Sequence, residues 1–346
     1  MSEPLVVSHG QGPRGAYVVH ELTDASVGFT FGGRPAIAKL RPGDRLYTQT
    51  KDCFGGAVAS IDDLPSQVCQ FPYLNPVTGP FHIIGAQPGD TLAVHLVSLH
   101  PSVPYGWSST FPHFGALTST AQTATLQPPL EERVWRYAID LHAQTVRYSA
   151  RTSDVKIDLP LEPMLGTVGV APAAGEVRMS IVPDRYGGNL DTPLLRAGST
   201  LYLGVNEPGA MLSLGDGHAR QGDGEVSGVA VEVAMDVVLA VDLIPGVYTP
   251  TPRLETDAAL MSIGLGRPLE DAFRVAQHDL VEQIAAVTGL DLLDALQLVA
   301  QAGETRVGNV VDANYSMVAR IAKRYLDGAC SYAGVHAGLR SSRPVL

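Results

Sequence analysis

The sequence has few cysteines, fewer basic than acidic residues, and no long hydrophobic run. Its three cysteines, Cys53, Cys69 and Cys330, are too few and too scattered for a disulfide framework. No Cys-x-x-Cys pair suggests a structural zinc site. This usage is typical of a reducing compartment, so we expect a cytoplasmic protein.

The charge balance and the hydropathy exclude two classes of partner. The sequence has 24 basic and 35 acidic residues, a formal net charge of −11, whereas nucleic-acid binding depends on a cationic face. No segment approaches the roughly 18 to 20 apolar residues of a membrane span, and the N-terminus lacks a cationic start followed by an apolar run. We therefore expect a soluble, non-exported protein with no nucleic-acid or membrane partner.

The residues that are abundant predict a β-rich fold. Hydrophobic residues make up 45% of the chain, and 36 glycines and 25 prolines punctuate it, as expected for many short strands joined by turns. From about residue 16 to 243, short alternating segments such as 91–96 and 229–233 are bounded by turn residues. We assign residues 1–254 to a β-rich catalytic region.

The hydrophobic period changes beyond residue 255, where a helical region (255–326) is predicted to pack on the same core. One helical stripe consists of Leu269, Ala272, Phe273, Ala276, Leu280, Ile284 and Val287, and Gly289 can close it. Asp291 is a candidate N-cap for a second helix that ends near Gly303. A third stripe predicts a third helix, with Met317, Ile321 and Tyr325 on its apolar face.

Residues 327–346 have no sustained period and are predicted to be a loose tail. The fold class is therefore mostly β with α. We expect a layered β/β/α architecture, with strands through about residue 243 and the helices of the C-terminal third packed on one face.

The segment 215–225 reads G-D-G-H-A-R-Q-G-D-G-E and is the strongest candidate site. Its polar members are Asp216, His218, Gln221, Asp223 and Glu225. Oxygen donors and an imidazole are ligands for a divalent cation, and glycines let the backbone curl so that several ligands converge. Asp216 and His218 would share one face of a strand. The alternative is a hairpin loop whose carboxylates accept hydrogen bonds from backbone amides while His218 is only solvated.

Two neighbouring residues, Asp52 and Cys53, are candidates outside that segment. Asp52 is predicted at the end of a strand, from which it could supply a metal ligand; alternatively it caps amides near Gly55. Cys53 could be a thiolate nucleophile, but no catalytic cysteine signature surrounds it, and a small buried hydrophobe is the favoured role.

A further candidate is the segment 186–191, Y-G-G-N-L-D. Its paired glycines expose backbone N–H groups, and Asn189 could add a donor for an oxyanion. A plain Gly-Gly-Asn turn is the alternative. Gly188, Asn189, Asp191 and Gln221 are the residues that we predict to bind substrate.

Several segments together resemble the acetamidase/formamidase family. They are T-K-D (50–52), N-P-V-T-G-P (75–80), G-A-Q-P-G-D (85–90), M-L-G-T-V-G-V-A-P (164–172), G-G-N-L-D (187–191) and, most strongly, 215–225. The resemblance implies a β-rich layered fold, homo-oligomers, and metal-assisted hydrolysis of small linear amides to a carboxylate and ammonia. Two positions depart from the family pattern: Ile84 stands where a Glu is common, and Tyr186 where a His is frequent. Because of these two differences, the resemblance does not identify which amide is the substrate.

The hypothesis for the mechanism places a divalent metal ion, with zinc as the first choice, on some of Asp52, Asp216, His218 and Glu225. Whichever of Asp223 and Glu225 is not a ligand would move the water proton to the leaving nitrogen. Asn189 would steady the oxyanion. A non-catalytic, metal-stabilised binding or scaffold protein is the alternative function, and metal-free hydrolysis by Cys53 is a third.

Overall fold

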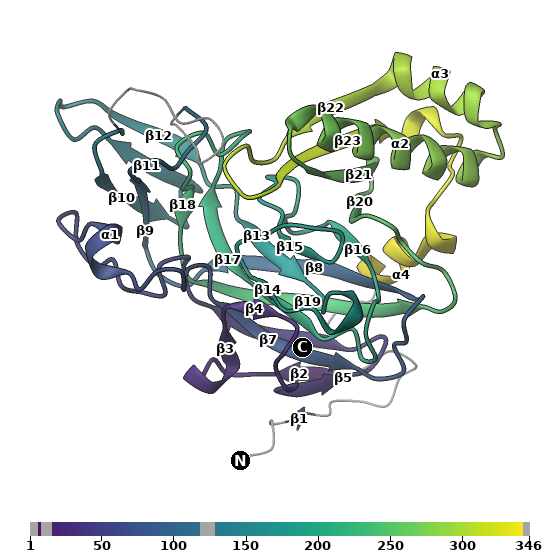
Figure 1. Ribbon diagram of the computed structural model, residues 1–346, viewed down its shortest axis with the longest axis horizontal. Helices are drawn as coiled ribbons and strands as arrows, with labels where there is room; N and C mark the ends of the chain where they lie inside the picture. Colours follow the sequence, from purple (N-terminus) through teal and green to yellow (C-terminus); the bar gives the residue numbers. More distant parts are fainter. Residues whose placement is uncertain (1–5, 8–15, 118–128, 342–346) are drawn as a thin grey trace.

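A computed structural model describes residues 6–7, 16–117 and 129–341, and two large sheets make up most of it (Figure 1). In spatial order, the ten-stranded sheet contains β1 (Val6–Val7), β2 (Tyr17–Val19), β6 (Arg45–Thr50), β19 (Met235–Ile244), β8 (Thr91–Pro101), β16 (Thr200–Gly204), β20 (Arg253–Glu255), β21 (Ala259–Gly266), β23 (Tyr315–Ala322) and β22 (Gly303–Val307). Neighbouring strands are antiparallel except for β2 and β6.

The second sheet has eleven strands and carries the candidate site. Its main path is β12 (Lys156–Pro160), β11 (Thr145–Ser149), β10 (Arg133–Asp140), β9 (Tyr105–Thr110), β18 (Val231–Glu232), β17 (Leu212–Arg220), β13 (Met164–Gly169) and β15 (Gly187–Asn189). Beside β17 lies β7 (Val77–Ile83), which also pairs with β3 (Val27–Gly28) and β5 (Ala38–Leu40). A separate pair joins β4 (Thr30–Phe31) to β14 (Arg178–Met179).

The helices are few and short apart from one. They are α1 (Pro65–Val68), α2 (Leu269–Thr288), α3 (Leu292–Ala302) and α4 (Val335–Ser341), with 3₁₀ turns η1 (Asp24–Ser26), η2 (Ala173–Gly175), η3 (Lys323–Tyr325) and η4 (Tyr332–Gly334). Among the described residues no single helix has the length and apolar composition of a membrane span. The pair α2 and α3 passes that test only together, with a bend of 114° between them.

The main core lies between the two sheets. Leu46 and Leu239 of the ten-stranded sheet join Leu165 and Leu214 of the other sheet in one buried apolar cluster. Burying these side chains stabilises the fold by about 1.5–3 kcal/mol each. The site-bearing strands β13 and β17 are therefore held on a rigid, well-packed face.

The first two predicted helices are confirmed, and caps explain both. In α2, Ala276 and Leu280 pack against the strands β21 and β23, and the helix ends at Gly289 in the left-handed region (φ 76°). The carboxylate of Asp291 then accepts hydrogen bonds from the amides of Leu293 and Asp294, both at 2.9 Å, and so begins α3. These helices cover one end of the ten-stranded sheet (Figure 1).

The third predicted helix is wrong, because Met317 and Ile321 lie on strand β23. This strand is paired along its length with β21 on one side and β22 on the other. It is buried on both faces, by α2 on one side and by the main core, through Val318, on the other, so its apolar residues do not alternate with polar ones. Residues after 254 thus contribute strands to the ten-stranded sheet as well as the helices that cover it.

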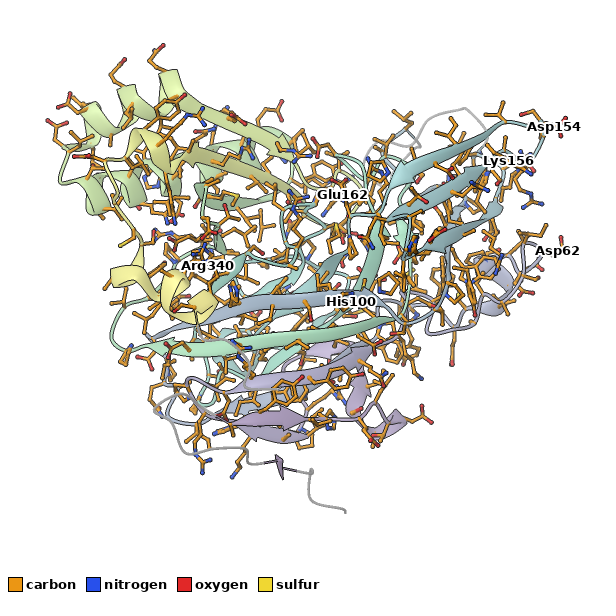
Figure 2. The ribbon with its side chains drawn as sticks, turned by 180° about the vertical axis from the view of Figure 1, so that it is seen from behind. Asp62, His100, Asp154, Lys156, Glu162 and Arg340 are labelled. Atoms are coloured by element: carbon orange, nitrogen blue, oxygen red, sulfur yellow. The ribbon has the colours of Figure 1, made fainter. Side chains whose placement is uncertain are left out.

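The segment predicted to be a loose tail (327–346) has defined structure over residues 327–341, and its last five residues lie outside the described part of the chain. Within it, Leu339 of α4 packs on Ala93 of β8 and Ala240 of β19, and the reverse view shows α4 lying over these long strands, with Arg340 labelled (Figure 2). His336 is buried and shares a hydrogen bond with the Thr200 hydroxyl at 2.8 Å. Polar contacts thus help to hold α4 in place, and the periodic spacing of apolar residues in a sequence does not indicate such contacts.

Candidate functional site

Strand β17 brings the two leading candidates together. Asp216 and His218 are both buried on this strand, and Asp216 Oδ1 lies 3.4 Å from His218 Nε2. Asp216 occupies the left-handed backbone region (φ 59°), and the pairing of β17 shifts register between His218 and Arg220. Such irregularities re-aim side chains at functional sites.

Unpartnered buried atoms surround the His218 ring. Among the described residues, Asp191 Oδ1, Asp216 Oδ1, His218 Nε2 and Glu232 Oε2 are buried without a hydrogen-bond partner. From His218 Nε2 the distances are 3.3 Å to Glu232 Oε2 and 4.0 Å to Asp191 Oδ1. Because buried polar atoms are nearly always paired, four orphans in one place indicate a site for something they share.

Gln221 fixes the orientation of the histidine. Its Nε2 donates hydrogen bonds to the carbonyls of Asp191 (2.7 Å) and Gly308 (3.0 Å), which leaves Oε1 facing His218 Nδ1 at 3.0 Å. His218 Nδ1 must therefore carry a hydrogen and donate it. In the neutral ring, Nε2 then presents a lone pair to the carboxylates, the form in which imidazole binds a metal.

Five buried carboxylates surround His218. They belong to Asp191, Asp216, Glu225, Glu232 and Asp312. Burial raises the pKa of Glu232 to about 7 and that of Asp312 to about 7. The pKa of Asp191 and that of Glu225 are also raised well above the ordinary range, first by burial and then by the other acids.

Asp216 and His218 shift in the directions expected of an ion pair. Burial lowers the pKa of His218, but the charges of Glu232 and Asp216 outweigh it, and the pKa is well above the ordinary value. Burial raises the pKa of Asp216, but the charge of His218 lowers it on balance. One imidazolium cannot neutralise five carboxylates, so the excess negative charge calls for protons or for a cation.

The donors fit a divalent cation. Two sets of three residues have ligand atoms within 4.8 Å of one another: Asp191, His218 and Glu225, and Cys53, Asp216 and Glu232. Mixed oxygen and imidazole donors suit zinc and related ions. Asp191 (φ 41°) and Glu225 (φ 47°) share the strained left-handed backbone of Asp216, which indicates that the fold stabilises this convergence at a cost.

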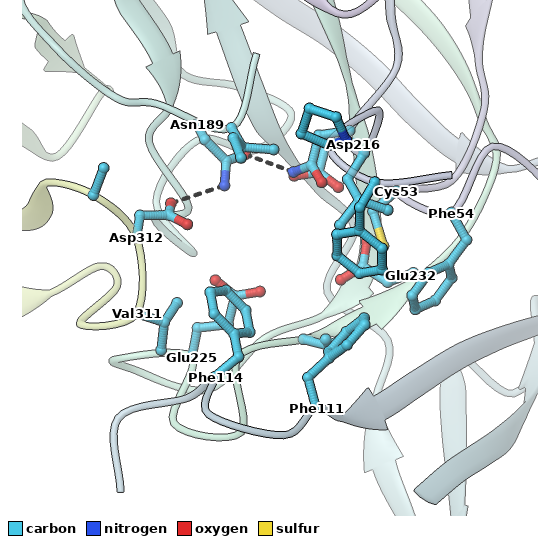
Figure 3. A pocket seen from close by; sticks show the side chains of 18 of the residues that line it. Cys53, Phe54, Phe111, Phe114, Asn189, Asp216, Glu225, Glu232, Val311 and Asp312 are labelled. Carbon is cyan, nitrogen blue, oxygen red and sulfur yellow. Dashed lines mark hydrogen bonds between the residues drawn. The ribbon is translucent and has the colours of Figure 1, made fainter. Parts of the chain in front are cut away.

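Asn189 ties the acids to one another. Its Nδ2 donates hydrogen bonds to Asp191 Oδ2 and to Asp312 Oδ2, the latter at 2.9 Å and drawn in Figure 3. Asn75 Nδ2 donates to Asn189 Oδ1 (3.1 Å) and to Asp216 Oδ2 (2.9 Å). With both amide hydrogens directed at carboxylates, Asn189 positions the acids and has no hydrogen left for an oxyanion.

The absence of a side chain at Gly166 leaves room for two of these acids. An added Cβ would lie 2.5 Å from Asp216 Oδ2 and still closer to Asp191 Oδ1. We predict that Gly166→Ala lowers metal affinity by roughly 10- to 100-fold, as other displacements around metal ligands do, without unfolding the protein. Metal titration and thermal melting would check this. The control is Gly338→Ala in α4, where an added Cβ meets nothing within 4 Å; equal affinities in the two variants would contradict it.

Three residues predicted from the sequence lie outside the cluster. Asp223 is half-exposed and pairs with Arg306 at 2.6 Å. The carboxylate of Asp52 accepts a hydrogen bond from the amide of Gly56 at 3.0 Å, which is the turn-capping role of the alternative interpretation. Gly188 is packed in β15, where a side chain would collide with the carbonyl of Val182.

Two further residues predicted to bind substrate, Asp191 and Gln221, contact the histidine side of the cluster instead. Asp191 contributes an orphaned oxygen beside His218, and Gln221 orients the ring. Neither is among the residues that line the cavity described below.

Glu232 and Asp312 were missed by the sequence analysis. Glu232 is a single charge within the apolar run V-A-V-E-V (229–233), and a lone acid in a buried strand was the available signal. Asp312 lies in the connection between β22 and β23, far along the chain from β17, and no local pattern marks it.

Cys53 is buried against Phe54 and Trp107 in a small apolar cluster. Burial raises the pKa of its thiol well above the ordinary value, and the charges of Glu232 and Asp216 add to the increase. A thiolate is therefore disfavoured, and the nucleophilic role loses its physical basis.

A cavity of about 570 Å³ opens beside the cluster. Asn189, Asp216, Glu225, Glu232 and Asp312 contribute polar side chains to its lining, and aromatic side chains gather on the remaining wall (Figure 3). A ligand in this cavity can reach the acids directly. Cavities of this size with a few convergent polar groups are typical binding sites.

Comparison with known proteins identifies the family. A model of the acetamidase/formamidase family matches residues 33–177 and 172–268, which is well over half of the chain. The chain belongs to the acetamidase/formamidase family. All the residues of the cluster except Asp312 lie within the matched ranges.

Similar proteins include curated acetamidases and formamidases as well as solved structures. An acetamidase from Mycolicibacterium smegmatis is 26% identical over 61% of this chain and 64% of the relative. A formamidase from Methylophilus methylotrophus is 26% identical over 61% and 62%. The chain thus spans less than two thirds of the length of these two relatives. The crystal structure of an acetamidase from Yersinia enterocolitica is 40% identical, with a TM-score of 0.85 over 93% of this chain and 96% of that one.

Proposed function

We propose that this protein hydrolyses the C–N bond of small linear amides. The family match supports this reaction class. The four orphaned atoms of Asp191, Asp216, His218 and Glu232 carry the proposal, because they form a buried ligand set of which Asp216 and Glu232 line the cavity. Water adds to the amide carbon, the C–N bond breaks, and the products are a carboxylate and ammonia. The proposed substrates are therefore small linear amides of the formamide and acetamide type.

His218, Asp216, Glu232 and Asp191 would hold a divalent metal ion, with zinc as the first choice. When bound, such an ion supplies Lewis acidity, which makes hydroxide available near neutral pH. The protein contributes the fixed orientation of His218 through Gln221. It also excludes bulk water from the carboxylates, all of which are buried.

Glu225 is the proposed proton carrier. Of the two acids proposed for this role from the sequence, Asp223 is paired with Arg306 away from the cavity, while Glu225 is buried and lines the cavity. Burial raises the pKa of Glu225 well above its usual range, and a raised pKa suits a group that takes a proton from water and returns it to the leaving nitrogen.

Metal removal separates the enzyme from the alternative of a metal-stabilised scaffold. We predict that dialysis against a chelator stops ammonia release from formamide and acetamide while circular dichroism stays unchanged, because two large sheets packed over one apolar core hold the fold without the ion. Adding back a divalent ion should restore turnover. Unfolding upon chelation, without any amidase activity beforehand, would favour the scaffold instead.

Cytoplasmic localisation and assembly into homo-oligomers remain part of the proposal. The composition supports the first, through the few scattered cysteines. The family resemblance supports the second.

A further inference from the structure

The cavity beside the acids is much larger than a formamide or acetamide molecule needs. Its volume is about 570 Å³, within the roughly 300 to 1,000 Å³ of cavities that enclose drug-sized ligands. A carboxamide reaching the acids would leave most of this space to whatever group is attached to it.

Apolar side chains, including four phenylalanines, make up most of the wall away from the acids, which Ser66 and His113 also line. The ring of Phe111 lies 6.4 Å from that of Phe54, 6.0 Å from that of Phe71 and 6.0 Å from that of Phe114. Other apolar residues of the lining are Leu74, Ile181, Val229 and Val311. The close-up shows Phe54, Phe111 and Phe114 around the space that the acids border (Figure 3).

This wall selects an apolar group. Edge-on and tilted phenylalanine rings favour contact with another flat or branched hydrocarbon, and they offer no partner to a polar substituent, which would lose its hydrogen bonds to water. Phe54 and Phe111 are already buried, so their positions are fixed by packing. Phe114 is half-buried and lines the cavity.

We infer that the amide substrate carries a bulky apolar acyl group, aromatic or branched, which lies against Phe111 and Phe114 while the carboxamide reaches the acids. This inference rests on the proposed amide hydrolysis. Because ammonia is the product, the amide nitrogen bears no substituent, so the apolar group must be attached to the carbonyl carbon. Simple acetamide then leaves the aromatic wall uncovered.

The test compares phenylacetamide with acetamide by ammonia release. Burying a benzyl group in place of a methyl group should raise kcat/KM by roughly 10- to 100-fold. Phe114→Ala should lower the phenylacetamide to acetamide ratio of kcat/KM by about tenfold or more. The matched control is Phe273→Ala, because Phe273 is 43% exposed on α2, outside the lining; it should leave the ratio unchanged.

The possible outcomes are distinguishable. Equal turnover of the two amides, or a preference for acetamide, would overturn the inference while leaving amide hydrolysis intact. Ammonia release from neither amide would overturn the proposed function. Calorimetry with phenylacetamide, on the wild-type protein and on Phe114→Ala, would then show whether the phenyl group binds against Phe114. Weaker binding by the variant supports this placement, and equal binding refutes it. If Phe114→Ala fails to fold, Phe114→Leu replaces it in both assays.

Discussion

His218→Ala is expected to remove bound metal and ammonia release together, in a protein that still folds. The imidazole is the single nitrogen donor among the buried acids around it, and its Nε2 faces three orphaned carboxylate oxygens. Loss of the ion removes several kcal/mol of stabilisation from the transition state, which corresponds to roughly a thousandfold or more in turnover. Elemental analysis and an ammonia assay measure the two effects.

The control for this variant is His100→Ala. His100 is exposed on β8 in the ten-stranded sheet, so its loss should change neither metal content nor turnover. Circular dichroism on both variants separates loss of function from loss of fold. Full metal content together with undiminished activity in His218→Ala would remove this histidine from the site.

Glu225→Gln is expected to lower kcat by roughly 10²- to 10⁴-fold with the metal retained, since the amide cannot accept and return a proton. Asp223→Asn provides a matched control two residues away. Its carboxylate lies in a half-exposed pair with Arg306, and such pairs contribute about 0–1 kcal/mol. We expect less than about a threefold change in kcat from this control.

Two results would contradict the role of Glu225. An unchanged kcat in Glu225→Gln would show that another group moves the proton. Loss of metal from the same variant would instead make Glu225 a ligand, as its grouping with Asp191 and His218 allows geometrically. Measuring metal content beside kcat keeps these two results apart.

The sequence was sufficient for the part of the site that is local in the chain. Asp216 and His218 are two residues apart, so strand geometry alone predicts that they share a face, and the structure places their side chains 3.4 Å apart. Glu232 and Asp312 join the cluster only because β18 pairs with β17 and because the β22–β23 connection crosses to β15. No local pattern encodes such long-range pairing.

The fold shows the same division between local and long-range information. The helices α2 and α3 could be predicted because Gly289 and Asp291 end and begin them through local backbone and capping contacts. Strand β23 was predicted as a helix because Met317 and Ile321 happen to fit a helical spacing. Pairing with two neighbouring strands overrides that spacing.

The metal site among the buried acids is tested by anomalous diffraction from crystals of the active protein, recorded at the absorption edge of the metal found by elemental analysis. We expect an anomalous peak within about 2.0–2.2 Å of His218 Nε2 and of carboxylate oxygens from Asp216, Glu232 or Asp191. Crystals of fully active protein with no peak among these side chains would contradict it.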